Sequence, residues 1–211
     1  MLNYNKVNVK SSFGHDINNW LITNAPEADH LLAFFPGMMN TCESPLLYYA
    51  REVALQAGCD ALCIEYGYGR ACVNFSDEFF ASTLDESAEA LRLCKLEQYR
   101  RVSFISKSFG TLIAGKAAER FPAVEIKHLF LTPVSHTVPF IQKGDCTVIY
   151  GAADSHFAES DAAQIAGVPK VQVVVLPGAD HSLEIRGDFR ASLRLLEQIC
   201  GIYEAFVCGK H

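Results

Sequence analysis

The chain has 211 residues, a mass of 23.3 kDa and a formal net charge of −6, and half of its residues are apolar. This length and composition predict one domain over residues 1–211 with a sizeable hydrophobic core, and they exclude a disordered or fibrous chain. Binding to nucleic acid or to an anionic membrane surface is not expected, because either partner requires a concentrated positive patch.

Targeting signals and cysteine chemistry are also constrained by the sequence. The longest apolar stretch, near residues 31–39, is far too short to span a membrane, and residues 1–10 lack the apolar core of a signal peptide. We therefore expect a cytoplasmic protein.

Most of the eight cysteines lie in apolar segments, which predicts reduced, buried thiols. Cys59 and Cys63 have no second ligand pair, so no zinc site is expected.

Short apolar, β-branched segments alternate with segments of helical periodicity, which predicts a mainly parallel sheet with helices on both faces. The first two strands are expected to pair as an antiparallel hairpin around residues 14–16. The expected strands are residues 7–9, 20–23, 30–35, 60–64, 101–106, 128–131, 147–151 and 172–176. The expected helices are residues 45–57, 77–98, 109–120, 159–166 and 189–206, the first with Pro45 in its first turn and the second capped by Ser76 or Asp77.

The segment 101–115 carries the most informative motif. A β-branched and aromatic run meets a helix, with only Ser106-Lys107-Ser108-Phe109-Gly110 between them. This resembles the nucleophile elbow of the α/β-hydrolase fold, where the residues two before and two after the nucleophile are small. Gly110 fits that pattern, and Ser106 stands where the family usually has Gly. Lys107 is expected to be exposed or loosely packed.

The order of the later motifs agrees with this resemblance. Asp154 follows one predicted strand and His181 follows the last, which matches the family order of Ser, acid and His. The resemblance therefore implies an α/β-hydrolase fold, a three-layer sandwich with a mostly parallel sheet of about seven or eight strands. It also implies Ser108 as nucleophile, His181 as base and Asp154 as the acid that orients it.

The loop after the strand at residues 30–35 resembles the family's oxyanion-hole loop, with Pro36 where a His is common. The resemblance implies one backbone donor at Met38, with Met39 as the close alternative. The second donor would be Phe109, at the start of a helix whose dipole favours negative charge.

Several other residues compete for these roles. Asp180 and Glu184 are less suitable acids because sequence neighbours of a His rarely face it. Ser106 lies within its predicted strand, which makes it a poor nucleophile. His156 could be mistaken for the base or for a metal ligand, but a surface position is expected. Residues that could contact substrate are Met39, Tyr66, Tyr68, Arg70 and Pro133.

The sequence thus predicts a serine hydrolase that acts on carboxylic esters of small molecules through an acyl-enzyme, without cofactor or metal; thioesters and amides stay open. The alternative is a catalytically silent binding or scaffold protein, for which the departures at Ser106 and Pro36 are the best support. The length leaves no room for a substantial cap, which favours an open site and small acyl groups. Both a monomer and a homodimer are compatible with the sequence.

Overall fold

The computed structural model describes residues 1–24, 28–68 and 76–209, and in them a single eight-stranded sheet has the order β1-β2-β4-β3-β5-β6-β7-β8. β1 pairs antiparallel with β2, and β2 pairs antiparallel with β4; all further neighbours are parallel. The strands are β1 Asn3–Lys10, β2 Asp16–Thr23, β3 His30–Phe35, β4 Asp60–Cys63, β5 Arg101–Lys107, β6 Ile126–Leu131, β7 Cys146–Gly151 and β8 Val171–Leu176. The predicted N-terminal hairpin and mainly parallel sheet are both confirmed.

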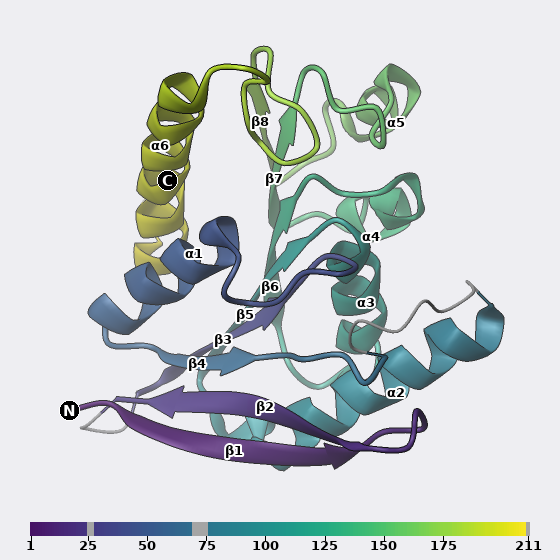
Figure 1. The fold of residues 1–211 in the computed structure, drawn as a ribbon, viewed down its shortest axis with the longest axis vertical. Coiled ribbons are helices and arrows are strands. Elements are labelled where there is room, and N and C mark those ends of the chain that lie inside the picture. Colours follow the sequence, from purple (N-terminus) through teal and green to yellow (C-terminus); the bar gives the residue numbers. More distant parts are fainter. Residues whose placement is uncertain (25–27, 69–75, 210–211) are drawn as a thin grey trace.

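Helices cover both faces of this sheet (Figure 1). α1 and α6 pack on one face, and α2 and α3 pack on the other, where α4 and α5 follow toward β8. The helices are α1 Pro45–Gln56, α2 Asp77–Leu93, α3 Phe109–Ala118, α4 Val138–Ile141, α5 Glu159–Ile165 and α6 Phe189–Cys208, with short 3-10 turns η1 Leu96–Gln98 and η2 Ser135–Thr137. This arrangement is the three-layer sandwich expected from the sequence.

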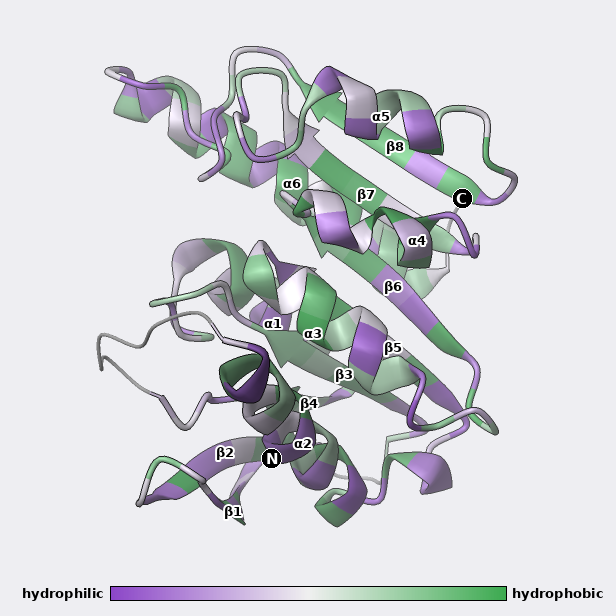
Figure 2. Ribbon diagram, turned by 90° about the vertical axis from the view of Figure 1, so that its right-hand side faces the viewer, coloured by the Kyte–Doolittle hydropathy of each residue, from purple (hydrophilic) through white to green (hydrophobic). Residues whose placement is uncertain are grey.

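The burial of each strand explains its composition. Every residue of β3 is buried, because helices lie on both sides of it, and its sequence is accordingly a continuous apolar run apart from His30. β1, at the edge, buries only Val7 and Val9. Figure 2 shows the same contrast, with hydrophobic central strands and a mixed outer hairpin.

The structure differs from the sequence prediction in the hairpin, in the second helix and in the β6–β7 connection. β1 and β2 each begin four residues before the strands predicted at residues 7–9 and 20–23. The second helix ends at Leu93 and not near residue 98, because Lys95 adopts a left-handed conformation (φ 56°) and a 3-10 turn follows. Its cap is Ser76, whose side chain accepts a hydrogen bond from the Phe79 amide. The connection from β6 to β7, for which no helix was predicted, contains η2 and α4, and α4 buries Val138 and Ile141.

The topology brings the loops after β3, β5, β7 and β8 to one edge of the sheet, since parallel strands end on the same side. Among the described residues, no helix combines the length and hydropathy that crossing a membrane requires. The cysteines in the described ranges are all free thiols, and five of them are buried as predicted, whereas Cys200 is half-buried and Cys208 is exposed. Cys72 lies outside those ranges.

Candidate active site

Ser108 occupies a sharp turn between β5 and α3. Its backbone has φ 52° and ψ −123°, a conformation that residues other than Gly rarely adopt. The turn is possible because Gly110 has no side chain: a Cβ there would lie 2.4 Å from the carbonyl oxygens of both Phe35 and Pro36. Ser106 is fully buried and also small enough for this close approach. The strand-turn-helix predicted from the sequence is therefore present, with Ser108 at its apex.

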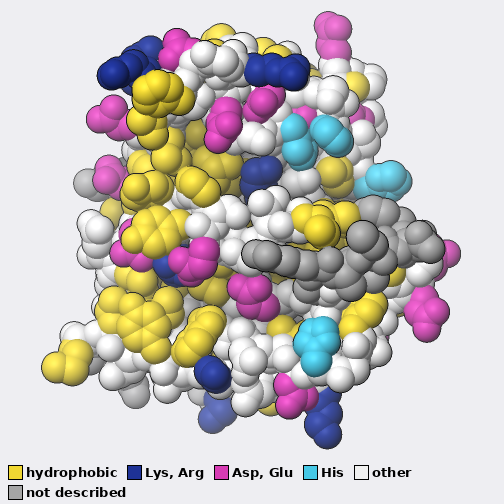
Figure 3. All heavy atoms as spheres, viewed as in Figure 1, with side chains coloured by type: hydrophobic (Ala, Val, Ile, Leu, Met, Phe, Trp, Pro, Cys, Tyr) yellow, Lys and Arg dark blue, Asp and Glu magenta, His cyan; other side chains and the backbone are white. Residues whose placement is uncertain are grey.

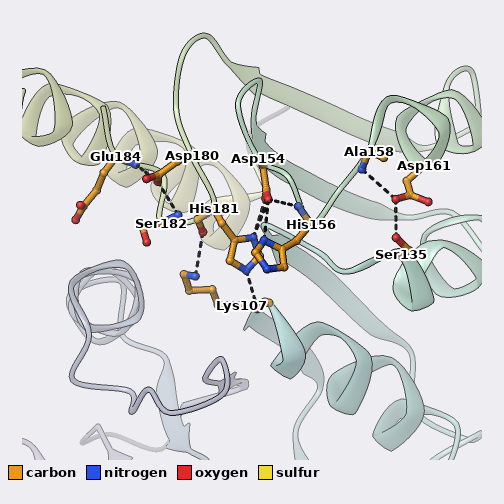
Figure 4. Close-up of polar contacts among 11 residues, drawn as sticks. Lys107, Ser135, Asp154, His156, Ala158, Asp161, Asp180, His181, Ser182 and Glu184 are labelled. Atoms are coloured by element: carbon orange, nitrogen blue, oxygen red, sulfur yellow. Dashed lines mark hydrogen bonds and ion pairs between the residues drawn. The ribbon is translucent and has the colours of Figure 1, made fainter. Parts of the chain in front are cut away.

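A continuous chain of hydrogen bonds starts at Ser108 and continues through His181 and Asp154, which Figure 4 labels. The Oγ of Ser108 lies 2.8 Å from Nε2 of His181, and Nδ1 of His181 lies 2.9 Å from each carboxylate oxygen of Asp154. Asp154 also accepts a hydrogen bond of 2.8 Å from the backbone amide of His156. The Asp154 side chain is buried, whereas His181 keeps part of its ring in solvent. The structure thus brings together the three residues that the sequence singled out.

The electrostatics suit an ionised Asp154. Burial raises the pKa of its carboxyl group, but the hydrogen bond from His181 and the one from the His156 amide outweigh it, so the pKa lies below its usual value. A carboxylate that stays charged can hold the His181 ring with Nδ1 protonated, which leaves Nε2 directed at the Ser108 hydroxyl.

The other residues considered for these roles make different contacts. Asp180 accepts the backbone amides of Ser182 and Glu184, so its carboxylate closes the turn that carries His181. Ser106 Oγ is buried with no hydrogen-bond partner among the described residues. His156 is exposed, as expected, yet its ring lies against that of His181, with centroids 4.2 Å apart and the ring planes tilted by 37°.

Lys107 departs from the sequence interpretation. It was expected to be exposed or loosely packed, but only 8% of it is accessible. Its Nζ donates a 3.2 Å hydrogen bond to the backbone carbonyl of His181 (Figure 4). Burial lowers its pKa, while Asp154, Asp180 and Glu184 oppose that shift. Lys107 therefore connects the His181 loop to the turn that carries Ser108. The only sequence signal for this role was its position next to Ser108.

The loop 36–39 forms the other side of the site. A Cβ on Gly37 would lie 3.3 Å from Cβ of Ser108, so the loop runs directly against the Ser108 side chain. Met38 is half-buried, and Met39 is exposed with φ 59°. The two candidate oxyanion donors of this loop, Met38 and Met39, directly follow Gly37 in the sequence, and their role stays a prediction.

Tyr66 contacts this loop, and Tyr68 packs against Tyr66. Tyr66 is buried, and its hydroxyl donates a 3.0 Å hydrogen bond to the carbonyl oxygen of Pro36. Its ring stacks on Tyr68, with centroids 5.4 Å apart, and meets Phe109 edge-on. The sequence suggested substrate contact for both tyrosines, which stays a prediction; the structure shows that Tyr66 supports the loop. No sequence pattern could identify this bond.

The two other candidate substrate contacts have different outcomes. Pro133 is buried just beyond β6, at the same edge of the sheet as Ser108. Arg70 lies outside the described residues. For metal binding, Asp154, His156 and His181 are the described residues whose ligand atoms converge, all within 4.8 Å of one another.

No family model matches the chain, and no curated protein sequence does. Solved structures do resemble it. They include a dienelactone hydrolase from Anabaena variabilis, at 16% identity over 95% of this chain and 96% of that one, with a TM-score of 0.65. Est1E from Butyrivibrio proteoclasticus, solved with ferulic acid, has 14% identity over 96% and 98%, and a TM-score of 0.67.

A third similar structure is an α/β serine hydrolase without a lid from Xanthomonas campestris, with 14% identity over 93% of this chain and 92% of that one and a TM-score of 0.63. At such identities the likeness concerns the fold. The chain has the α/β-hydrolase fold that its sequence predicted.

Proposed function

We propose that the protein is a serine hydrolase that cleaves carboxylic esters of small, accessible acyl groups. The observation that carries the proposal is the unbroken hydrogen-bond chain from Ser108 through His181 to the buried carboxylate of Asp154. A serine hydroxyl is a weak nucleophile at neutral pH, and such a chain supplies the base that activates it.

Each residue has a defined part in the reaction. His181 Nε2 takes the proton of Ser108 Oγ as that oxygen attacks the ester carbonyl carbon, and Asp154 stabilises the imidazolium that forms. His181 then returns the proton to the departing alkoxide, which leaves as the alcohol, and Ser108 holds the acyl group as an ester. Water, deprotonated by His181, attacks this acyl-enzyme and releases the acid with Ser108 restored.

The oxyanion of each tetrahedral intermediate would be bound by the backbone amides of Met38 and Phe109. Phe109 is the first residue of α3, so the positive end of the helix dipole faces the developing charge. Gly37, which precedes Met38, packs against Ser108. One such donor typically lowers the barrier by about 2.7–4 kcal/mol.

An open site favours small or accessible acyl groups. His181 is partly exposed, and the segment between β6 and β7 holds only η2 and α4. The similar structures support an ester substrate, because they include a dienelactone hydrolase and an esterase solved with ferulic acid. The same three residues could also cleave thioesters or amides, and these substrate classes stay open.

A fluorophosphonate probe tests the proposal directly. We expect stoichiometric labelling of the native protein, no labelling of Ser108→Ala, and normal labelling of Ser106→Ala, whose hydroxyl has no hydrogen-bond partner among the described residues. A series of p-nitrophenyl esters of increasing acyl length should show fastest turnover for the short chains. Well-folded protein that is neither labelled nor active on esters would instead identify a silent binding protein.

A further inference from the structure

Two histidines share the carboxylate of Asp154. Nδ1 of His181 lies 2.9 Å from it, and Nδ1 of His156 lies 3.6 Å from Oδ1 on the same group. The chemistry described above uses only His181. Figure 4 shows both rings side by side beneath Asp154. His156 is therefore a second imidazole at the centre of the site with no assigned task.

The three side chains have the spacing of a metal ligand set. One ligand atom from each lies within 4.8 Å of the other two. In a tetrahedral zinc site with bonds of 2.0–2.1 Å, ligand atoms are about 3.3 Å apart. The two pairs that include Asp154, at 2.9 and 3.6 Å, bracket that value, and the two imidazole ligand atoms lie within 4.8 Å of each other.

The three side chains can also be reached from solvent, because His156 is largely exposed. The His156 side chain is 60% exposed and that of His181 is 23% exposed, whereas the Asp154 side chain is fully buried. Histidine side chains gather at the surface of this face in Figure 3. An ion could thus arrive from solvent at the exposed His156 and settle on the buried carboxylate, which supplies the negative charge.

We propose that Asp154, His156 and His181 bind one divalent metal ion such as Zn²⁺, and that this ion inhibits hydrolysis. Two imidazoles with one carboxylate favour Zn²⁺, Co²⁺ or Cu²⁺ over Mg²⁺ and Ca²⁺, which prefer oxygen ligands. The ion takes the place of the proton between His181 Nδ1 and Asp154, and that proton leaves to solvent. The inhibitory part rests on the proposed function; the binding does not.

Inhibition follows from what the metal occupies. Once its Nδ1 binds the cation, His181 is a weaker base at Nε2, and Asp154 is bound to the metal instead of stabilising an imidazolium. Ser108 then loses its proton acceptor. His156 provides the third protein ligand, and without it the ion would be held by two side chains only.

Binding is tested on Ser108→Ala protein, which keeps all three ligands and needs no turnover. Titration calorimetry with Zn²⁺ should show one ion per chain, and Co²⁺ should give the visible absorption of a four-coordinate site. Adding His156→Ala should weaken binding at least tenfold, whereas adding His15→Ala, at the exposed β1–β2 turn, should not. Circular dichroism checks that each variant is folded. Equal binding by the His156→Ala protein, or no binding at all, would overturn the proposal.

Inhibition is tested on enzyme with Ser108 intact, with each rate expressed relative to the metal-free rate of the same variant. Zn²⁺ should inhibit ester hydrolysis reversibly, with full recovery on chelation, and His156→Ala should raise the half-inhibiting concentration at least tenfold. Equal sensitivity of the two proteins would refute the inhibitory role. Metal binding by a protein without esterase activity would refute the proposed function and leave the metal site standing.

Discussion

On one side of Ser108, His181 and Asp154 are joined by side-chain hydrogen bonds of 2.8–2.9 Å. On the other side, the backbone of the loop 36–39 packs against Ser108. The Tyr66 hydroxyl holds this loop, and the lack of a side chain at Gly110 leaves room for it. The first side depends on charge and on proton positions, and the second depends on packing. Substitutions should therefore affect them differently: polar changes on the first side reduce activity in a folded protein, and steric changes on the second also reduce stability.

The largest effect is expected from Asp154→Asn. An amide cannot stabilise the imidazolium and favours the wrong tautomer of His181, so kcat should fall by about 10⁴ with the fold intact. Asp180→Asn is the matched control, because its carboxylate accepts only backbone amides of its own turn. Ester hydrolysis and thermal unfolding of both variants measure this. An unchanged kcat in Asp154→Asn would show that Asp154 is not the orienting acid.

Gly110→Ala should come next, and here stability changes with activity. The new Cβ would meet two backbone oxygens at 2.4 Å, which cannot move away cheaply. We expect a loss of about 2–3 kcal/mol in the free energy of unfolding, and about a hundredfold lower kcat. Gly201→Ala in α6 meets nothing within 4 Å and should stabilise by up to about 1 kcal/mol. Denaturant unfolding measures the free energy of unfolding of both variants. Equal values would contradict the conclusion that a side chain at position 110 clashes with the backbone of the loop.

Lys107→Met should have an intermediate effect on the first side. The variant keeps an unbranched apolar stem but loses the hydrogen bond from Nζ to the His181 carbonyl. A hydrogen bond from a charged donor is worth about 1.5–3 kcal/mol, and we expect kcat to fall about tenfold as the His181 loop loses its anchor. Lys116→Met, an exposed lysine paired with Glu119, serves as control and should keep kcat unchanged. No loss in Lys107→Met would show that the loop is held without this bond.

The smallest effect is expected from Tyr66→Phe. It preserves the aromatic stack and removes only the bond to the Pro36 carbonyl, worth about 1 kcal/mol, so kcat should fall about fivefold with little change in KM. Tyr68→Phe is the control, because no partner of its buried hydroxyl is found among the described residues. Binding of a boronic acid, which mimics the oxyanion adduct, should weaken in parallel with kcat for Tyr66→Phe alone. Equal kinetics of the two variants would deny Tyr66 its positioning role.

The sequence predicted most of the fold because its signals are local. The continuous apolar run of β3, the cap at Ser76 and the small residue at Gly110 each act within a few neighbours. The early end of α2 was missed for a local reason as well: Lys95, an ordinary helix former, takes the left-handed conformation there, and no Gly marks the change.

What the sequence by itself determined is the order of the elements and the residues carried by the turns at Ser108, Asp154 and His181, since strand ends and turns follow from periodicity and local conformation. Only the tertiary structure decided what those turns meet. Lys107 reaches the His181 carbonyl, Tyr66 reaches Pro36, and these contacts join residues 74 and 30 positions apart. Such contacts depend on how the layers pack in space, and a pattern read along one chain carries no record of that packing.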